Sequence, residues 1–382
     1  MPATAFAGAH LTINLDAITA NWRALGARLK GGALAAAVIK ANAYGLGMAA
    51  VAPALHKAGC REFFVASLDE AIALRAILPE GRIYVFFGPS AQDAAEYSRH
   101  RLIPVLNDLG QIDAWRARSN AGEGEKAVLH VDTGMSRLGL PPDEVALLVA
   151  EPARLAGLNI AYVMSHLACA EQPGHAMNAA QLAEFKVALE SLGAHTANSK
   201  ASLANSSAIF LGPEYHFDLA RPGAALYGLN PTPDQPNPMS EVVRLQGKIL
   251  QVRRVDSSRS VGYGAAHVAE RPSRIATVPV GYADGYLRSA SNQAANQACG
   301  YIRGARAPVV GRVSMDMITL DVTDIPQAHA HPGAAVDLIG GPYPVDRFAA
   351  DAGTIGYEIL TMLGQRYRRL YVEDGKQRIA AE

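Results

Sequence analysis

The first part of the chain alternates short apolar runs with longer stretches rich in Ala and Leu. Short runs that are apolar on both faces are typical of strands in a buried parallel sheet. The runs that predict such strands are Ala36–Ile39, Glu62–Ala66, Ile83–Phe87, Ile103–Leu106, Val128–Val131 and Ile160–Met164. Two further strands, with more polar residues, are expected at His195–Ala201 and His216–Ala220.

The stretches between these runs have the amphipathic pattern of helices. Leu68–Leu78 follows Ser67, a residue type that caps helix N-termini, and Asn178–Leu192 is a second example. Strands that alternate with helices imply a parallel sheet. Eight such units fit a closed (β/α)8 TIM-type barrel better than an open sheet. We therefore expect an α/β barrel over residues 10–236.

The pattern changes at the Pro-rich segment Asn230–Pro238, which is typical of a linker. Strand-like runs separated by Gly- and Pro-rich turns follow, and a final helix is expected at Val345–Leu363. We expect a mostly-β C-terminal domain over residues 237–382, with residues 1–9 as a candidate addition to it. The runs that predict its strands are Val242–Val255, Arg274–Val280, Ala307–Val322 and Ala334–Ile339.

Composition narrows the class of protein. The 382 residues are 49% hydrophobic and 18% charged, which suits a large globular enzyme. Lys plus Arg equals Asp plus Glu at 35 each, so no net field favours nucleic acid or an anionic membrane. The widely spaced Cys60, Cys169 and Cys299 predict reduced thiols and no metal site. Because we see neither a secretory signal nor an apolar run of membrane-spanning length, we expect a cytoplasmic protein.

Lys40 ends the first apolar run and is a candidate reactive residue. In a barrel of this type, chemistry gathers where strands end and the following loops begin. A lysine at a strand end can also simply extend its amine into water. In a desolvated pocket, however, its pKa falls and the amine becomes a nucleophile that forms Schiff bases.

Other polar residues follow later strands of the predicted barrel. Taken singly, an arginine after a turn is usually a solvated charge, a lone histidine is usually structural, and small polar residues form turns or caps. Because all of them are expected at one edge of one barrel, a functional site is favoured over scattered surface charges. The loops after the seventh and eighth strands commonly bind phosphate, which predicts a phosphorylated cofactor. The residues concerned are Arg137, His166, Asn205, Ser206, Arg221 and Gly223.

Tyr263 lies far along the chain, between Gly262 and Gly264 in the expected β domain. A tyrosine in such a turn is commonly half-buried packing. For a functional role, its phenol would have to lie near a cation, so that it can act as a base.

These segments together resemble the bacterial alanine racemases. Val38–Gly45 is similar to the cofactor-lysine motif of that family, and further blocks of the family recur in order over almost the whole chain. One block is weak evidence, but the ordered series is specific. The other blocks are Val131–Arg137, Ser202–Ser206, Arg221–Gly223, Leu226–Gly228, Gly262–Gly264, Val280–Tyr286, Gly311–Asp316 and Ile355–Glu358.

The resemblance implies a pyridoxal 5'-phosphate enzyme that interconverts L- and D-alanine. By this resemblance Lys40 binds the cofactor covalently and removes the α-proton of D-alanine, while Tyr263 removes that of L-alanine from the opposite face. It also implies a head-to-tail homodimer with composite active sites, in which Tyr263 and Met315 come from the partner subunit. Arg221 resembles the family's partner of the pyridine nitrogen.

The remaining roles also follow from the resemblance alone. His166 is similar to a residue that links Tyr263 with Arg221, and Asn205 to a cofactor-binding residue. Tyr44, Ser206 and Tyr357 resemble phosphate ligands, aided by the backbone near Gly223. Arg137 and the backbone at Met315 resemble contacts for a cofactor oxygen and the substrate carboxylate. Tyr282 and His130 are similar to supporting residues.

The chain departs from the family at His130. Many members have a lysine carbamate there, whose anion orients the arginine at the position of Arg137. A histidine does not supply that charge, so either another anion orients Arg137 or this arginine is held more loosely. We expect weaker substrate binding rather than a loss of activity. Leu46 and Ser136 replace a common histidine and glycine.

Three alternatives remain beside this resemblance. One is a racemase that accepts serine or other amino acids. Another is a related decarboxylase of basic amino acids, but such enzymes typically have a catalytic cysteine and an acidic partner for the pyridine nitrogen. Here Arg221 takes that place, and Cys299 lies outside any matching motif. The last is a non-catalytic carrier of the cofactor. Such carriers lack a β domain, whereas one is expected here, with Tyr263 in it.

Overall fold

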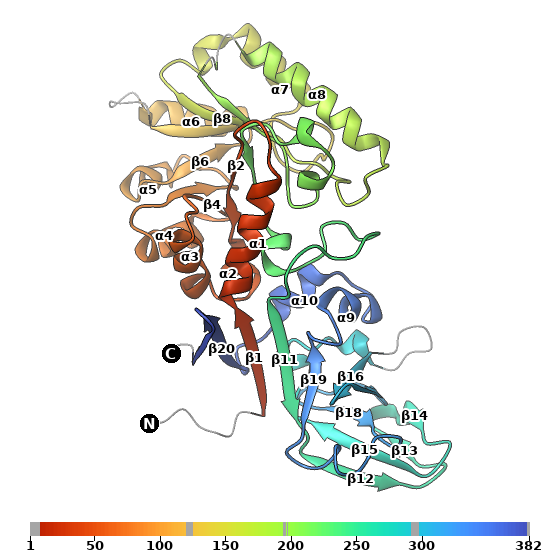
Figure 1. The fold of residues 1–382 in the computed structure, drawn as a ribbon. Coiled ribbons are helices and arrows are strands. Elements are labelled where there is room, and N and C mark those ends of the chain that lie inside the picture. The colour runs from red at the N-terminus through yellow and green to blue at the C-terminus, as the bar shows by residue number, and fades with distance from the viewer. Residues whose placement is uncertain (1–7, 120–124, 194–195, 197, 292–297, 380–382) are drawn as a thin grey trace.

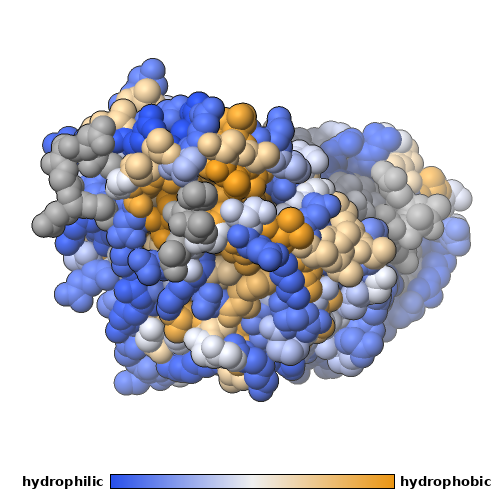
Figure 2. Space-filling model, turned by 90° about the horizontal axis from the view of Figure 1, so that it is seen from above, coloured by the Kyte–Doolittle hydropathy of each residue, from blue (hydrophilic) through white to orange (hydrophobic). Residues whose placement is uncertain are grey.

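The computed structural model describes residues 8–119, 125–193, 196, 198–291 and 298–379. The chain forms two parts, one of strands surrounded by helices and one built mainly of strands, with α9 (Val345–Asp351) and α10 (Gly356–Met362) between them (Figure 1). Seen from above, the first part has a patch of apolar side chains within a mainly hydrophilic border (Figure 2). In the described residues, no helix combines the length and apolar character needed to cross a membrane.

The first part is the predicted barrel. Its strands pair in parallel, each with the next along the chain, from β3 to β9. They correspond to the apolar runs of the sequence, because both faces of each strand are covered by other side chains. Their bounds are β3 (Ala37–Val38), β4 (Glu62–Val65), β5 (Arg82–Val85), β6 (Ile103–Leu106), β7 (Lys126–His130), β8 (Asn159–Met164) and β9 (Lys200–Ser202).

The barrel is closed by β10 (Leu219–Ala220) and β2 (Leu34–Ala35), which pair in parallel. On one side, the Ala36 N–H donates to the Ala220 carbonyl at 2.9 Å. On the other side, the Arg221 N–H donates to the Ala204 carbonyl at 2.8 Å, which joins β10 to the end of β9. This circular pairing confirms the barrel.

Helices surround the barrel, and two of them were predicted. The α4 helix (Leu68–Ile77) begins after Ser67, whose hydroxyl accepts from the Glu70 N–H at 3.4 Å, and α8 spans Ala176–Leu192. The last two units contain short 3₁₀ turns instead, among them η2 (Ala208–Phe210) and η4 (Ala224–Tyr227). The other helices are α1 (Leu15–Arg28), α3 (Met48–Lys57), α5 (Ala94–Arg99), α6 (Leu109–Ser119) and α7 (Pro142–Ala150).

The two weaker strand predictions were too long. His195 lies outside the described residues, and the seventh strand begins only at Lys200. Most of His216–Ala220 is not strand either, because the η3 turn (Pro213–Tyr215) precedes it and Phe217 has a φ of 48°. A backbone in the left-handed region cannot continue a strand.

The second part contains a mixed sheet in the order β17-β16-β19-β11-β1-β20-β21. Its strand β1 (Ala9–Asn14) pairs antiparallel with β11 and parallel with β20, so the start of the expected barrel range lies in this sheet. Buried and partly exposed residues alternate along β1, as on a sheet with one covered face. The other strands are β11 (Val243–Lys248), β16 (Cys299–Ile302), β17 (Ala305–Pro308), β19 (Ala335–Ile339), β20 (Arg368–Glu373) and β21 (Lys376–Ile379).

Further strands complete the second part, and several predicted elements are divided. A smaller sheet has the order β12-β15-β18, and β13 (Ser260–Val261) pairs with β14 (His267–Val268). The Val242–Val255 run breaks between β11 and β12, and Ala307–Val322 between β17 and β18. The final helix is interrupted near Gly353, whose φ of 73° ends α9. The remaining bounds are β12 (Gln251–Val255), β15 (Ser273–Val278) and β18 (Ile318–Asp321).

The two parts meet at the loop that follows β3. Arg369 of β20 donates to the Gly45 carbonyl at 2.6 Å, and the Tyr371 hydroxyl donates to the Leu46 carbonyl at 2.8 Å. Gly45 has a φ of 81°, and a Cβ there would lie 2.4 Å from the Leu360 carbonyl oxygen of α10. The second part therefore holds the loop that begins at Lys40.

This packing predicts that Gly45→Ala lowers the melting temperature more than Gly31→Ala. Both glycines have positive φ, but a Cβ at Gly31 meets no atom within 4 Å. The control substitution therefore measures backbone strain alone, about 1–2 kcal/mol. At Gly45 the clash with α10 adds about 1–3 kcal/mol. Equal melting temperatures for the two variants would contradict the close contact.

Candidate functional site

The backbone after β3 takes an unusual conformation. Ala41, Asn42, Ala43 and Tyr44 have φ values between 51° and 55°, so the α2 segment (Lys40–Tyr44) is a left-handed turn. The left-handed region costs residues other than glycine about 1–2 kcal/mol each, so surrounding contacts must hold this turn. One such contact is the Met48 N–H, which donates to the Asn42 side chain at 2.7 Å.

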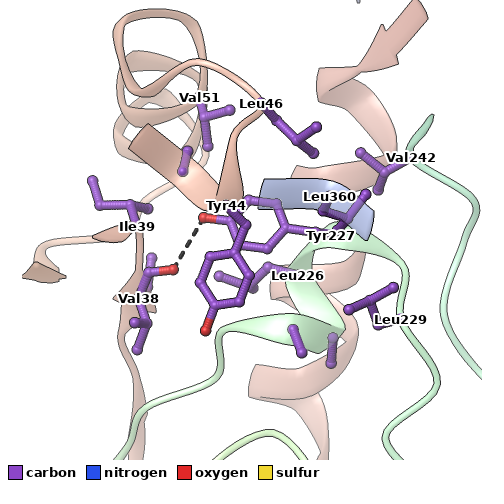
Figure 3. Packing of buried hydrophobic residues seen from close by; sticks show 14 of the residues in the cluster. Val38, Ile39, Tyr44, Leu46, Val51, Leu226, Tyr227, Leu229, Val242 and Leu360 are labelled. Carbon is purple, nitrogen blue, oxygen red and sulfur yellow. Dashed lines mark hydrogen bonds between the residues drawn. The ribbon is translucent and has the colours of Figure 1, made fainter. Parts of the chain in front are cut away.

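The strand that precedes Lys40 is fixed by two tyrosines whose rings pack at an angle of 31°. The Tyr227 hydroxyl donates to the Val38 carbonyl at 3.0 Å, and the rings of Tyr44 and Tyr227 lie 4.7 Å apart (Figure 3). Both tyrosines are buried among Leu and Val side chains. The position of Lys40 is thus set by packing on both sides of it.

The half-buried Lys40 lies in an electropositive setting. Burial lowers the pKa of its amine, the Arg137 guanidinium lowers it further, and Glu70 opposes the change. The Nζ atom lies 5.9 Å from the centroid of the Phe86 ring. A lysine in this setting is more readily deprotonated than one in water, as a nucleophile or base requires.

Arg221 is a buried cation at the same end of the barrel, with 3% of its surface exposed. Its guanidinium donates to the Ser202 hydroxyl and, at 2.5 Å, to the Ser165 carbonyl. Burial lowers its pKa to about 10, so it stays charged at neutral pH. Ser165 follows β8, Ser202 ends β9 and Arg221 follows β10. We call this end of the barrel the rim.

Two histidines at the rim are neutral. Burial, followed by the charge of Arg221, lowers the pKa of His130 to about 3. The same causes lower the pKa of His166 well below 6.5, with smaller contributions from Arg137 and Lys40. Neutral imidazoles can accept hydrogen bonds among these cations without adding to the charge.

Hydroxyl groups and backbone N–H groups gather near Gly223. The Ser206 hydroxyl accepts from the N–H groups of Gly223 and Ala225 at 3.0 and 3.2 Å. A Cβ at Gly223 would lie 2.3 Å from the Tyr44 hydroxyl, so only glycine allows this approach. The Tyr357 ring of α10 lies 6.2 Å from that of Tyr44. Within the described ranges, neither of these two tyrosine hydroxyls has a hydrogen-bond partner.

This arrangement suits a phosphate group. Phosphate offers only acceptor oxygens near neutral pH, and free phenol hydroxyls beside a glycine backbone are donors for it. Asn205 makes a structural contact, because its side chain accepts from the Ala208 N–H at 3.0 Å at the start of η2.

Tyr263, Met315 and Tyr282 of the second part have exposed side chains in a single chain. Tyr263 is between β13 and β14, which lie at the end of the molecule away from α2 (Figure 1). Its side chain is 72% exposed, and those of Met315 and Tyr282 are 53% and 41% exposed. The Ala283 N–H donates to the Met315 carbonyl at 3.0 Å, which links the segments of these two residues.

Two rim residues were not predicted from the sequence. Glu70 accepts from the N–H groups of Asn42 and Ala66 at 3.3 and 2.9 Å, and its charge partly opposes the lowering of the Lys40 pKa. Asn107 bonds to His130 at 2.8 Å. Asn107 directly follows the predicted strand Ile103–Leu106, so the strand-end criterion used for Lys40 would have found it.

A closed barrel with a lysine of lowered pKa beside a phosphate-type cradle, followed by a β part, defines a class of pyridoxal-phosphate enzymes. Family comparison agrees with this class. The family descriptions "Alanine racemase, N-terminal domain" and "Alanine racemase, C-terminal domain" match residues 13–231 and 242–371. The chain therefore belongs to the alanine racemase family.

Individual relatives cover nearly the whole chain. It is 54% identical over 367 residues to "Alanine racemase" of Rhodospirillum rubrum, covering 96% of each chain. It is 49% identical over 370 residues to "Alanine racemase, catabolic" of Mesorhizobium japonicum, covering 96% of this chain and 94% of that one.

Solved structures show the same fold. The alanine racemase of Bartonella henselae with covalently bound pyridoxal phosphate has a TM-score of 0.90 and 41% identity, covering 97% of this chain and 100% of that one. The biosynthetic alanine racemase of Pseudomonas aeruginosa has a TM-score of 0.84 and 37% identity, covering 96% and 99%.

The neutral state of His130 predicts a pH dependence of stability. Its pKa is about 3 in the folded chain, against 6.5 as its ordinary value. Between these values the unfolded chain takes up a proton that the folded chain does not. The stability contribution is therefore complete above pH 6.5 and falls as the pH drops toward 3, by up to about 1.4 kcal/mol per pH unit.

The measurement is chemical denaturation between pH 7 and pH 5 at one protein concentration. We expect His130→Gln, which has no titrating ring, to lose less stability over this range than the unaltered protein. Parallel pH curves for the two proteins would show that folding does not lower the pKa of His130.

Proposed function

We propose that this protein is a pyridoxal-phosphate-dependent racemase that interconverts L- and D-alanine. The observation that carries the proposal is Lys40, with its lowered pKa, at a barrel rim that also holds a cradle for phosphate. Family membership and 54% identity to an alanine racemase support it. Relatives named as catabolic and as biosynthetic are both similar to the chain, so either role is compatible with the similarity.

The residues of the rim fit the cofactor. The free hydroxyls of Tyr44 and Tyr357, with Ser206 and the backbone at Gly223, would hold its phosphate. The Lys40 amine would attach to it covalently, and the alanine racemase of Bartonella henselae likewise holds pyridoxal phosphate by a covalent bond. When bound, the cofactor withdraws electrons from the substrate α-carbon and so makes its proton removable.

Arg221 would face the nitrogen of the cofactor ring. It is charged at neutral pH, and it donates hydrogen bonds without releasing a proton. Its fixed contacts with Ser202 and Ser165 keep it in place. Arg221 would therefore leave the bound ring less electron-withdrawing than an acid would, and so would restrain side reactions such as transamination.

Racemisation needs a base on each face of the substrate. If one group removed and returned the proton on the same face, the configuration would be kept. We assign one face to Lys40 Nζ and the other to the Tyr263 hydroxyl, each taking the proton in one direction and giving it in the other. Arg137 would bind the substrate carboxylate, with help from the Met315 backbone. A small pocket would select the methyl side chain.

The exposed position of Tyr263 supports a homodimer. In one chain it lies away from Lys40, so a second subunit must supply the base for the opposite face. Other large apolar side chains after residue 237 are also exposed, as in a surface that a partner covers. They include Tyr282, Met315, Met317, Ile355 and Met362.

We also propose two domains that divide near residue 236, with β1 joined to the second by its pairing with β11 and β20. The three cysteines are unpaired, which supports a reducing compartment and the cytoplasm as the location.

Replacing Lys40 by Ala should lower racemisation of alanine by about a thousandfold or more, because the covalent attachment and one base are lost together. Circular dichroism of D-alanine would follow the rate, and visible absorbance would follow the bound cofactor. Lys57→Ala is the control, because Lys57 is an exposed lysine paired with Asp374 at 3.1 Å. Full activity in Lys40→Ala would remove the proposed mechanism.

Mixing two inactive variants tests the shared site. In a hybrid dimer of Lys40→Ala and Tyr263→Ala subunits, one site keeps Lys40 from one chain and Tyr263 from the other. Random exchange of subunits should therefore restore activity to about a quarter of the wild-type level. If each chain built its own complete site, the mixture would remain inactive.

A further inference from the structure

His130 is held by a hydrogen bond whose direction can be assigned. Its Nδ1 lies 2.8 Å from Oδ1 of Asn107. The Asn107 amide nitrogen donates to the carbonyls of Phe86 and Val105, each at 3.0 Å. Carbonyl oxygens only accept, so the atom facing them must be nitrogen and the atom facing His130 must be oxygen.

Gln111 fixes the same network from the other side. Its amide nitrogen donates to the Phe87 carbonyl at 2.9 Å, and its oxygen accepts from the Asn107 N–H at 2.8 Å. Both amides are therefore oriented by the backbone at the ends of β5 and β6.

The tautomer of His130 follows from this orientation. Because Asn107 Oδ1 only accepts, Nδ1 of His130 must carry the hydrogen. The ring is buried at the end of β7 and neutral, so its Nε2 presents a lone pair. In the part of the chain that the structure describes, this Nε2 has no hydrogen-bond partner.

A donor without a partner is carried by the adjacent loop. Residues 132–140 fold back on β7, where the Leu140 N–H donates to the His130 carbonyl at 2.8 Å. A Cβ at Gly139 would lie 3.2 Å from Cδ2 of His130, so this loop covers the Nε2 side of the ring. Arg137 is on the loop, and its guanidinium makes no hydrogen bond with any described residue.

The charges around the ring favour an acceptor role. Arg137 and Arg221 place positive charge near His130, and Asp132 places negative charge there. The carboxylate of Asp132 is already bonded to the N–H groups of Gly134, Met135 and Ser136 at 2.9–3.1 Å. The lone pair of Nε2 is thus an uncommitted acceptor beside these cations.

We propose that His130 is a positioning residue whose Nε2 accepts a hydrogen bond from Arg137 in the substrate-bound site, and that Asn107 and Gln111 impose the tautomer this requires. The inference rests on the proposed function, in which Arg137 binds the substrate carboxylate. A neutral acceptor occupies one N–H of the guanidinium and leaves its full charge and other donors to the carboxylate. The residue thus acts on substrate binding rather than on proton transfer.

Steady-state kinetics of two substitutions test the role. His130→Leu removes the acceptor, and we expect the KM for alanine to rise about tenfold with a smaller change in kcat. His130→Gln places an amide oxygen near Nε2, and we expect its KM to stay within about threefold of wild type. An unchanged KM in a folded, cofactor-loaded His130→Leu protein overturns the proposal.

The control is His216→Leu. His216 is another buried histidine, bonded through Nε2 to the Ile209 carbonyl at 3.0 Å and through Nδ1 to the Lys30 N–H at 3.2 Å. This substitution should lower the melting temperature and leave the KM unchanged, since His216 contacts no rim residue described above. If the KM of His216→Leu rose as much as that of His130→Leu, the effect at His130 would be a general structural one, and the proposal would be overturned.

A direct readout does not depend on activity. In wild-type protein labelled with ¹⁵N-histidine, the resonances missing from His130→Gln identify His130. We expect a protonated Nδ1 and an unprotonated Nε2 between pH 6 and 8, and the opposite tautomer or a charged ring overturns the proposal even if His130→Leu does not fold. Wild-type protein that fails to racemise alanine would instead contradict the proposed function, and the tautomer result would be unaffected.

Discussion

The structure depends on how the loop after Lys40 is held in place. Four consecutive residues there have left-handed backbone conformations, which an isolated peptide would not keep. The contacts of Arg369 and Tyr371 with the carbonyls of Gly45 and Leu46 hold the loop from β20. These bonds tie the barrel to the second part at the point where the site begins. The β part therefore positions the lysine loop even before any partner subunit is considered.

Positive charge is concentrated at the rim, where Lys40, Arg137 and Arg221 outnumber the carboxylates of Glu70 and Asp132. Arg221 and Arg137 lower the pKa values of both His130 and His166, and Lys40 lowers that of His166. The protein does not pair all of these cations with carboxylates of its own. Instead it surrounds them with neutral acceptors such as the Ser202 hydroxyl and the Ser165 carbonyl. Such a rim keeps its charge for anionic groups of bound molecules.

The amide network of Asn107 and Gln111 gives the rim a defined hydrogen-bond direction. Every amide atom in it that faces the backbone meets a carbonyl or an N–H whose role is fixed. The backbone at the ends of β5 and β6 orients the amides of Asn107 and Gln111. Asn107 in turn orients His130 at the end of β7. A histidine with one determined tautomer can serve as a neutral acceptor in a place where a carboxylate would cancel the charge of Arg137.

The sequence by itself determined the barrel, the position of Lys40 at a strand end and the mostly-β second part, because buried strands leave apolar runs and turns leave Gly and Pro. The ordered motifs also indicated the family and the candidate residues. Only the tertiary structure decided that β1 pairs with β11 and β20, because strand pairing joins residues far apart in the chain. It also decided the left-handed turn after Lys40 and the tautomer of His130. Both depend on partners such as Tyr371 and Asn107, which come from other strands and leave no local pattern beside the residues they fix.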